Sequence, residues 1–167
     1  MIYDAILTPH LLYCNIAWAT SSNYSMLRLF RLQKKAVRLV SHASFLAHTS
    51  PIFYRFKILN IYDLNNFNIA IFMYLCFKNC IPTSLSKYFC LNSEVRSYNM
   101  RSQLDYHLPL FKTNVGLQSV FYTGPKIWNS LPNEVKLSPS LNIFKRRYKQ
   151  LLLDTYSLFF FGGRGVV

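Results

Sequence analysis

Residues 24–41 distribute apolar and basic side chains at the period of an α-helix, and this pattern constrains the fold more than any other. One arc of the 3.6-residue period holds Met26, Leu29, Phe30, Ala36, Val37 and Val40. The opposite arc holds the cations Arg28, Arg31, Lys34, Lys35 and Arg38. Such a division is typical of a helix that buries one face against a core. We therefore expect an amphipathic helix whose outward face is strongly basic.

Three pairs of a hydroxyl residue and a proline predict further helix starts. These pairs are Thr8-Pro9, Ser50-Pro51 and Ser138-Pro139. A Ser or Thr N-cap accepts a hydrogen bond from an otherwise unpaired amide, and proline is tolerated at the first helical position because an amide there needs no helical partner. We expect helices over about residues 8–20, 50–60 and 138–153.

The remainder of the chain is expected to be helical except for one segment near its middle. A helix capped by Asp63 is expected to run to Cys80, and another over residues 117–131 would be kinked or split at Gly124-Pro125. Residues 83–115 lack a helical period and favour short strands or irregular segments, around residues 96–100 and 107–111. The expected fold is mainly α, with a small irregular or β segment and a C-terminal helix.

The chain is strongly basic: its 167 residues include 19 Lys and Arg against 6 Asp and Glu, for a net charge of +13. No acidic residue lies between Asp4 and Asp63, so neighbours in the sequence cannot neutralise the cations of residues 24–41. Like charges three and four residues apart destabilise a helix, whereas a phosphate backbone along that face would release counterions. The pattern favours nucleic-acid binding over a merely solvated face.

A second basic cluster lies near the C-terminus and consists of Lys145, Arg146 and Lys149. It has the composition of an ordinary surface helix as well as that of a phosphate-binding face. The sequence does not decide between these two interpretations, and both clusters are kept as candidate nucleic-acid-binding residues.

Motifs for catalysis are missing from the sequence. Neither a glycine-rich phosphate loop nor a Gly-x-Ser-x-Gly motif occurs, and the six acidic residues lie far apart. Zinc ligands could come from Cys76, Cys80, Cys90 and His107. A cysteine pair inside an apolar helix is, however, more typical of a buried core than of a metal site. We expect no catalytic residue, no metal ion, no cofactor and no small-molecule substrate.

Cysteine content and hydropathy bear on the cellular compartment. Four cysteines are too few for a disulfide scaffold, and Met1 is followed by the acidic Asp4 rather than by the basic start of a signal peptide. Residues 5–27 carry no formal charge, but they include Pro9, His10 and Asn15, which disfavour a bilayer span. We expect a cytoplasmic or nuclear protein that is not secreted and does not enter a membrane.

Several short motifs follow one another between about residues 5 and 153. They are residues 9–18 (PHLLYCNIAW), 32–38 (LQKKAVR), 48–51 (HTSP), 57–61 (KILNI), 98–102 (YNMRS), 113–116 (TNVG), 124–132 (GPKIWNSLP), 138–141 (SPSL) and 144–145 (FK). In this order they resemble the region that follows the catalytic palm in reverse transcriptases of non-LTR retrotransposons, of the jockey and LINE-like kind. Residues 32–38 resemble the basic helix of that family.

The resemblance implies a helical thumb-like bundle over residues 1–92, a post-thumb region with short strands and helices over residues 93–156, and a flexible tail over residues 157–167. In this family the thumb grips the template–primer duplex while palm carboxylates hold the metal ions. The chain has no palm, fingers or endonuclease segment and no aromatic-Ala-Asp-Asp tract, so no catalytic residue is carried over. The implied function is that of a truncated RNA-directed DNA polymerase fragment that binds RNA or an RNA/DNA duplex without sequence preference, alone or with an intact polymerase in trans.

Other interpretations remain open. The chain is also consistent with a non-functional relic of such an element, or with a protein-interaction module whose basic face is merely solvated. A peripheral membrane protein is the least favoured of these alternatives. Binding to a heteroduplex at low salt separates the first interpretation from the others, because phosphate contacts give affinity without sequence readout.

Overall fold

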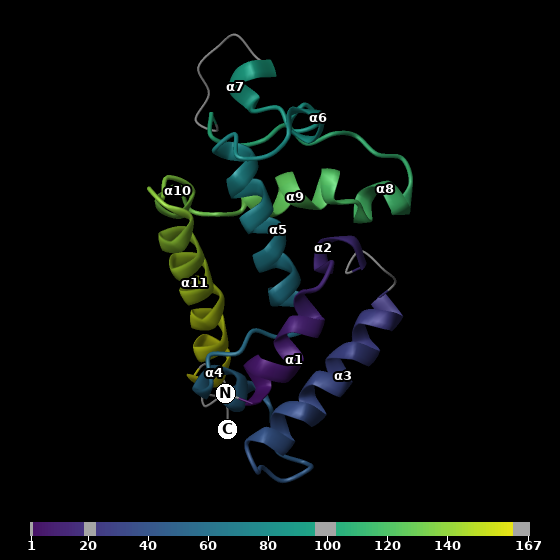
Figure 1. Ribbon diagram of the computed structural model, residues 1–167, viewed down its shortest axis with the longest axis vertical. Helices are drawn as coiled ribbons and strands as arrows, with labels where there is room; N and C mark the ends of the chain where they lie inside the picture. The colour runs from purple at the N-terminus through teal and green to yellow at the C-terminus, as the bar shows by residue number, and fades with distance from the viewer. Residues whose placement is uncertain (1, 19–22, 96–102, 162–167) are drawn as a thin grey trace. The chain divides into compact units, whose positions relative to one another are not determined.

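The computed structural model describes residues 2–18, 23–95 and 103–161, and these are mainly helical (Figure 1). Side chains are described through residue 156, with the exception of Asn23. The expectation of a mainly α fold is thereby confirmed. Within the described ranges, extended pairing is limited to one antiparallel bridge between Leu91 and Tyr106.

The strand expected at residues 107–111 is wrong, because this segment forms neither helix nor strand. Pro109 has no amide hydrogen and cannot contribute to a strand ladder. Only the His107 N–H continues the pairing beyond the bridge, by donating to the Cys90 carbonyl oxygen at 2.8 Å. The other expected strand, at residues 96–100, lies outside the described residues.

The helices of the described residues keep one order along the chain. They are α1 (Ile2–Leu12), α2 (Asn15–Trp18), α3 (Asn23–Val40), α4 (Ser50–Arg55), α5 (Ile61–Phe77), α6 (Thr83–Ser86), α7 (Asn92–Val95), α8 (Asn114–Gln118), α9 (Val120–Asn129), α10 (Asn133–Lys136) and α11 (Leu141–Phe161). The tail expected over residues 157–167 is therefore wrong for residues 157–161, which continue α11.

Packing within the chain groups the residues into two compact units. The first unit contains the described residues up to Asn65 together with those from Tyr148 onward, and the second contains Asn66–Arg147. This division differs from the boundary expected between residues 92 and 93. The reason is that the C-terminal part of α11 belongs with the N-terminal helices, as shown by the Tyr156 hydroxyl, which accepts a hydrogen bond from the Asn60 N–H at 3.1 Å.

The core of the first unit is formed where α1 packs on α3 (Figure 1). Its buried members are Tyr3, Val37, Phe53 and Ile58. Residues 23–40 form a single helix with Met26 and Val37 buried, so the expected amphipathic helix is confirmed. Burial of these apolar side chains supplies the main stabilisation of α3, because its outward face carries little that would hold it in place.

A buried glutamine fixes α3 in position. The Gln33 side-chain amide donates to the Tyr3 hydroxyl at 2.8 Å and to the Leu59 carbonyl oxygen at 3.0 Å. Its carbonyl oxygen accepts the N–H of Ile61 at 2.8 Å, at the start of α5. Buried amides that satisfy both donors and acceptors specify one packing arrangement, because any shift would leave a polar group unpaired. Gln33 thus ties α3 to α1 and to the start of α5.

The hydroxyl–proline pair Ser50-Pro51 opens α4 as expected, although α4 ends at Arg55 rather than near residue 60. The pair Thr8-Pro9 does not open a helix. It lies inside α1, which begins at Ile2 because Tyr3, Leu7 and other residues upstream of the pair already pack on the first core.

The third pair, Ser138-Pro139, also lies outside a helix start. Ser138 is fully buried and its hydroxyl donates to the Val135 carbonyl oxygen at 2.7 Å, so it serves the turn after α10. The Tyr74 hydroxyl donates to the Ser138 carbonyl oxygen at 2.8 Å and holds this turn from the other side. The helix expected from residue 138 begins instead at Leu141.

The N-terminus of α5 is capped by Asn60 and not by Asp63, as the sequence suggested. The Asn60 side-chain oxygen accepts the N–H groups of Tyr62 and Asp63, each at 2.9 Å. Asn is as good an N-cap as Asp, and here it stands immediately before the first helical residue. Asp63 lies one turn further on, and its carboxylate is free to make other contacts.

Three helices end in the same backbone motif. His42, Lys57 and Asn79 have φ values of 51°, 53° and 53°, and each lies two residues beyond the end of its helix. The amide that follows each of them bonds the carbonyl oxygen five residues back: Ala43 to Arg38, Ile58 to Phe53 and Cys80 to Leu75. This is the Schellman arrangement, in which the left-handed position is usually occupied by glycine.

The second unit is built around Trp128, which is fully buried. Its ring lies 5.2 Å from that of Phe77 and 6.2 Å from that of Phe144, and its indole N–H donates to the Leu104 carbonyl oxygen at 2.9 Å. A large ring with a satisfied polar tip contributes strongly to a core.

The helix break expected at Gly124-Pro125 is wrong, because both residues lie buried inside α9. The break falls at Ser119, whose side chain accepts the Phe121 N–H at 3.3 Å. Gly124 is required by close packing, because a Cβ added there would lie 2.7 Å from the Met73 sulfur. The sequence Gly-Pro therefore marks a close helix contact and not a turn.

Candidate nucleic-acid interface

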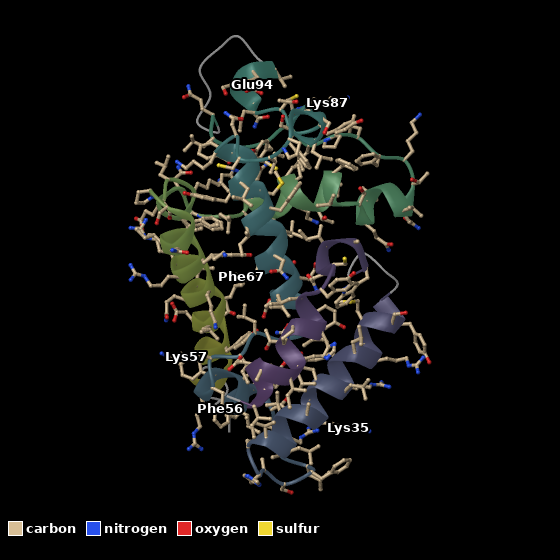
Figure 2. The ribbon with its side chains drawn as sticks, in the orientation of Figure 1. Lys35, Phe56, Lys57, Phe67, Lys87 and Glu94 are labelled. Carbon is tan, nitrogen blue, oxygen red and sulfur yellow. The ribbon has the colours of Figure 1, made fainter. Side chains whose placement is uncertain are left out.

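The five cations expected on residues 24–41 all lie on α3 and form what we call the basic strip, defined as Arg28, Arg31, Lys34, Lys35 and Arg38. Arg28, Arg31 and Lys35 are exposed, whereas Lys34 and Arg38 are partly buried. Figure 2 shows Lys35 on this helix. At 1.5 Å per residue, the strip extends over roughly 15 Å of the helix axis.

The contacts of these cations are with rings and one backbone group. The Arg28 guanidinium lies 5.9 Å from the centre of the Tyr24 ring, and the Lys34 ammonium lies 4.2 Å from that of Phe30. Arg38 donates through Nε to the Ala47 carbonyl oxygen at 2.9 Å. In the part of the chain that the structure describes, no carboxylate forms an ion pair with any of the five. Their positive charge is therefore not compensated by those residues.

The apolar face of α3 accounts for the direction of the strip. Met26 and Val37 are buried in the first unit, and Gln33 is held by three hydrogen bonds on the same side of the helix. Because that side is fixed, the opposite arc must face away from the core. The strip is thus a preformed surface on a rigid element, which is what phosphate binding without ordering of the protein requires.

Two exposed leucines accompany the strip, a feature that the sequence analysis did not single out. Leu32 and Leu39 are 59% and 76% exposed. They are seven residues apart on α3, so they lie on the same side of the helix, beside the basic arc. The i, i+7 spacing of two leucines outside the apolar arc is the sequence signal that indicates this edge.

The second basic cluster lies on α11, where Arg146 and Lys149 are exposed and Lys145 is partly buried. The neighbouring Arg147 donates to the Glu134 carbonyl oxygen at 2.8 Å and so supports the turn before α11. The boundary between the two units falls between Arg147 and Tyr148. The cluster therefore does not lie within one compact unit, in contrast to the strip on α3.

Sequence reasoning missed a cavity of about 330 Å³ in the first unit. Its walls include Phe30, Lys34, Phe53, Asn60, Asp63 and Tyr156. The Asp63 Oδ2 accepts hydrogen bonds from the Tyr156 hydroxyl and, at 2.7 Å, from the Asn60 side-chain amide. Asn60 followed by Asp63 is a recognisable helix-start pattern, but no local signal indicates that Tyr156 joins them from α11.

Burial controls the ionisation of these groups. Desolvation raises the pKa of Asp63, and the hydrogen bonds from Tyr156 and Asn60 oppose that rise. Desolvation also raises the pKa of the Tyr156 hydroxyl, and the hydrogen bond to Asp63 raises it further. Tyr156 therefore remains protonated and acts as a donor toward the carboxylate.

The cysteines and acidic residues form no recognisable metal centre. Among residues 2–18, 23–95 and 103–161, no group of three or more His, Cys, Asp and Glu side chains is arranged to hold a metal ion. Cys76 is buried, and desolvation raises the pKa of its thiol to about 12. Asp105 pairs at 2.7 Å with Lys136, whose side chain is almost wholly buried, which gives this carboxylate a structural partner.

The described helices also contain no stretch that is both long enough and apolar enough to cross a lipid bilayer. The chain matches no protein-family model, no curated protein and no solved structure. What supports a family assignment is therefore the order of the sequence motifs alone.

Proposed function

We propose that this chain is the thumb-like C-terminal part of a non-LTR retrotransposon RNA-directed DNA polymerase, and that it binds the template–primer duplex without catalysing its extension. The basic strip on α3 contacts the phosphate backbone of RNA or of an RNA/DNA duplex. The observation that carries this proposal is the uncompensated charge of Arg28, Arg31 and Lys35 on one exposed helix face.

Two further features support the proposal. The strip contains residues 32–38, which resemble the basic helix of that polymerase family. Its cations stand on a helix whose opposite side is fixed in a core, so binding does not have to order the protein. Phosphate contacts from such a face give affinity that depends on salt and not on base sequence.

The test replaces Arg28, Arg31 and Lys35 together by Glu. Arg38 is left unchanged because its hydrogen bond to the Ala47 carbonyl oxygen supports the segment after α3. We expect the triple variant to bind a heteroduplex at least about tenfold more weakly at low salt. The slope of log affinity against log salt should fall by roughly one for each phosphate that is no longer neutralised. Fluorescence anisotropy with a labelled RNA/DNA duplex measures both quantities.

The matched control replaces Lys78, Lys87 and Lys112 by Glu, which gives the same net charge. All three are exposed and belong to the second unit. The control is expected to weaken binding by less than the α3 variant, because it removes only nonlocal attraction. Equal weakening by the two variants would contradict the assignment of the strip and would leave only an unspecific charge effect.

Catalysis is tested separately, by primer extension with the chain alone in the presence of Mg²⁺. We expect no extension, because the resemblance covers only the region after the palm and carries no metal-binding carboxylates. Any extension by the purified chain would contradict the proposal. This assay is independent of the binding measurement, so one can fail while the other succeeds.

A protein-interaction module is the second candidate, and the exposed Leu32 and Leu39 favour it. Exposed apolar side chains that gather on one surface are typical of interaction sites. Replacing both leucines by Ser separates the two candidates. Duplex binding should be unchanged by this variant if phosphates are the ligand, whereas a partner protein that docks on the leucines would lose affinity.

A further inference from the structure

The cavity of the first unit is a candidate ligand site because its size and lining are those of one. Its volume of about 330 Å³ lies at the lower end of the range of small-molecule pockets. Phe30 and Phe53 form an apolar side of it, with ring centres 6.5 Å apart in a stacked arrangement. Its polar groups come from α3, α5 and α11, so elements far apart in the sequence converge on one space.

One polar side of the cavity is an oriented carboxylate. Two donors, the Tyr156 hydroxyl and the Asn60 side-chain amide, bind the same oxygen of Asp63, Oδ2. A carboxylate has about four acceptor positions, and these two donors leave those on Oδ1. Within the described ranges no protein donor reaches Oδ1. The Asp63 carboxylate is thus fixed in orientation and retains capacity to accept hydrogen bonds from a ligand.

The other polar side carries a cation that also belongs to the basic strip. Lys34 lines the cavity and lies one residue from Lys35 on α3. Its ammonium group lies against the Phe30 ring, at 4.2 Å from the ring centre. A strand whose phosphates follow the strip therefore passes the entrance of a cavity that has an aromatic wall and a carboxylate.

We propose that this cavity receives one unpaired guanine base of a strand bound along the basic strip. The Asp63 Oδ1 accepts the N1–H and the exocyclic N2–H of the base, and Lys34 contacts the phosphate of the same nucleotide. This inference rests on the proposed function, because it assigns base recognition to a surface proposed to bind the backbone.

The choice of guanine follows from the chemistry of the four bases. Asp63 offers acceptors and no donor, and guanine alone presents two adjacent N–H donors on its Watson–Crick edge. Adenine and cytosine place a ring acceptor beside their amino group, and uracil places carbonyl oxygens on both sides of its N–H. These acceptors would face the carboxylate without a proton between them, and a buried polar group left unpaired disfavours binding.

The experiment titrates the full chain with GMP, AMP, CMP and UMP at low salt and follows binding by calorimetry or by amide NMR shifts. We expect GMP to bind roughly fivefold to a hundredfold more tightly than the other three, the range for one two-point base contact. Equal affinity for all four nucleotides would contradict the guanine site.

Variants assign the two ends of the ligand. Asp63→Asn should reduce GMP affinity to the level of AMP, whereas Asp4→Asn, at an exposed carboxylate of α1 outside the cavity, should not. Lys34→Met should weaken GMP but leave guanosine unchanged, because guanosine lacks the phosphate. Lys35→Met is its matched control, since Lys35 does not line the cavity, and should leave GMP binding unchanged. Loss of GMP binding in both controls, or in neither cavity variant, would contradict the assignment.

Heteroduplex binding is measured on the same samples so that the two proposals can fail separately. A chain that binds the duplex but shows no preference among nucleotides retains the proposed function and loses the guanine site. A chain that binds GMP but no duplex retains the site and loses the proposed function. Tighter binding of a duplex with an unpaired guanine overhang than of one with a uracil overhang would support both, and the Asp63→Asn variant should abolish that difference.

Discussion

The two units are held by different kinds of core. The second unit centres on aromatic rings, with Trp128 packed against Phe77, Tyr106 and Phe144. The first unit has a smaller aromatic content and fixes its helices through buried polar groups, above all Gln33 and the Asp63–Tyr156 pair. An aromatic core tolerates small shifts, whereas a hydrogen-bonded amide permits only one arrangement. The unit that carries the basic strip and the cavity is therefore the one that is fixed by polar contacts.

Removing the central ring of the aromatic core should have the largest effect. Trp128→Ala deletes a fully buried side chain and leaves the Leu104 carbonyl oxygen without its donor. We expect the free energy of unfolding to fall by about 3–5 kcal/mol, measured by urea denaturation. Tyr88→Ala, at a 57% exposed ring of the same unit, is the control and should cost less than about 1 kcal/mol. Similar losses in both would contradict the central position of Trp128.

Breaking the polar core of the first unit should cost less in stability. Gln33→Ala leaves the Tyr3 hydroxyl, the Leu59 carbonyl oxygen and the Ile61 N–H without this partner. We expect a decrease of roughly 1–3 kcal/mol in the free energy of unfolding, with weaker heteroduplex binding because α3 is no longer held in one orientation. Gln118→Ala, at an exposed glutamine of α8, should change neither quantity. A change in stability alone would indicate that Gln33 does not orient the strip.

The smallest effect is expected at Asp63, and it depends on pH. Because burial raises the pKa of this carboxyl in the folded state, the folded state favours its neutral form. The resulting stabilisation is fully present below the pKa of the unfolded chain and is lost as pH rises through the raised pKa. Asp63→Asn, which is neutral at every pH, should therefore have a higher Tm than the parent at pH 7, and the difference should shrink in acid. A lower Tm at pH 7 would show that the Tyr156 hydrogen bond outweighs desolvation.

The helix of residues 24–41 and the mainly α class could be predicted from the sequence because the 3.6-residue period is a local signal. Starts and breaks were less predictable, since they depend on distant partners. Gly124-Pro125 lies within a helix because Met73 packs against it, and α11 continues past residue 153 because Tyr156 joins Asn60 and Asp63. The cavity is of the same kind: its carboxylate and its tyrosine are 93 residues apart, and no sequence pattern relates them.

The ends of α3, α4 and α5 have a consequence for engineering this chain. Each reverses direction at a side-chain-bearing residue with φ near 50°, a conformation that disfavours a Cβ by roughly 1–2 kcal/mol. His42, Lys57 and Asn79 thus hold latent stability that glycine would release, and none of them belongs to the strip or lines the cavity. A sturdier scaffold is accessible at positions remote from both surfaces on which nucleic acid is proposed to lie.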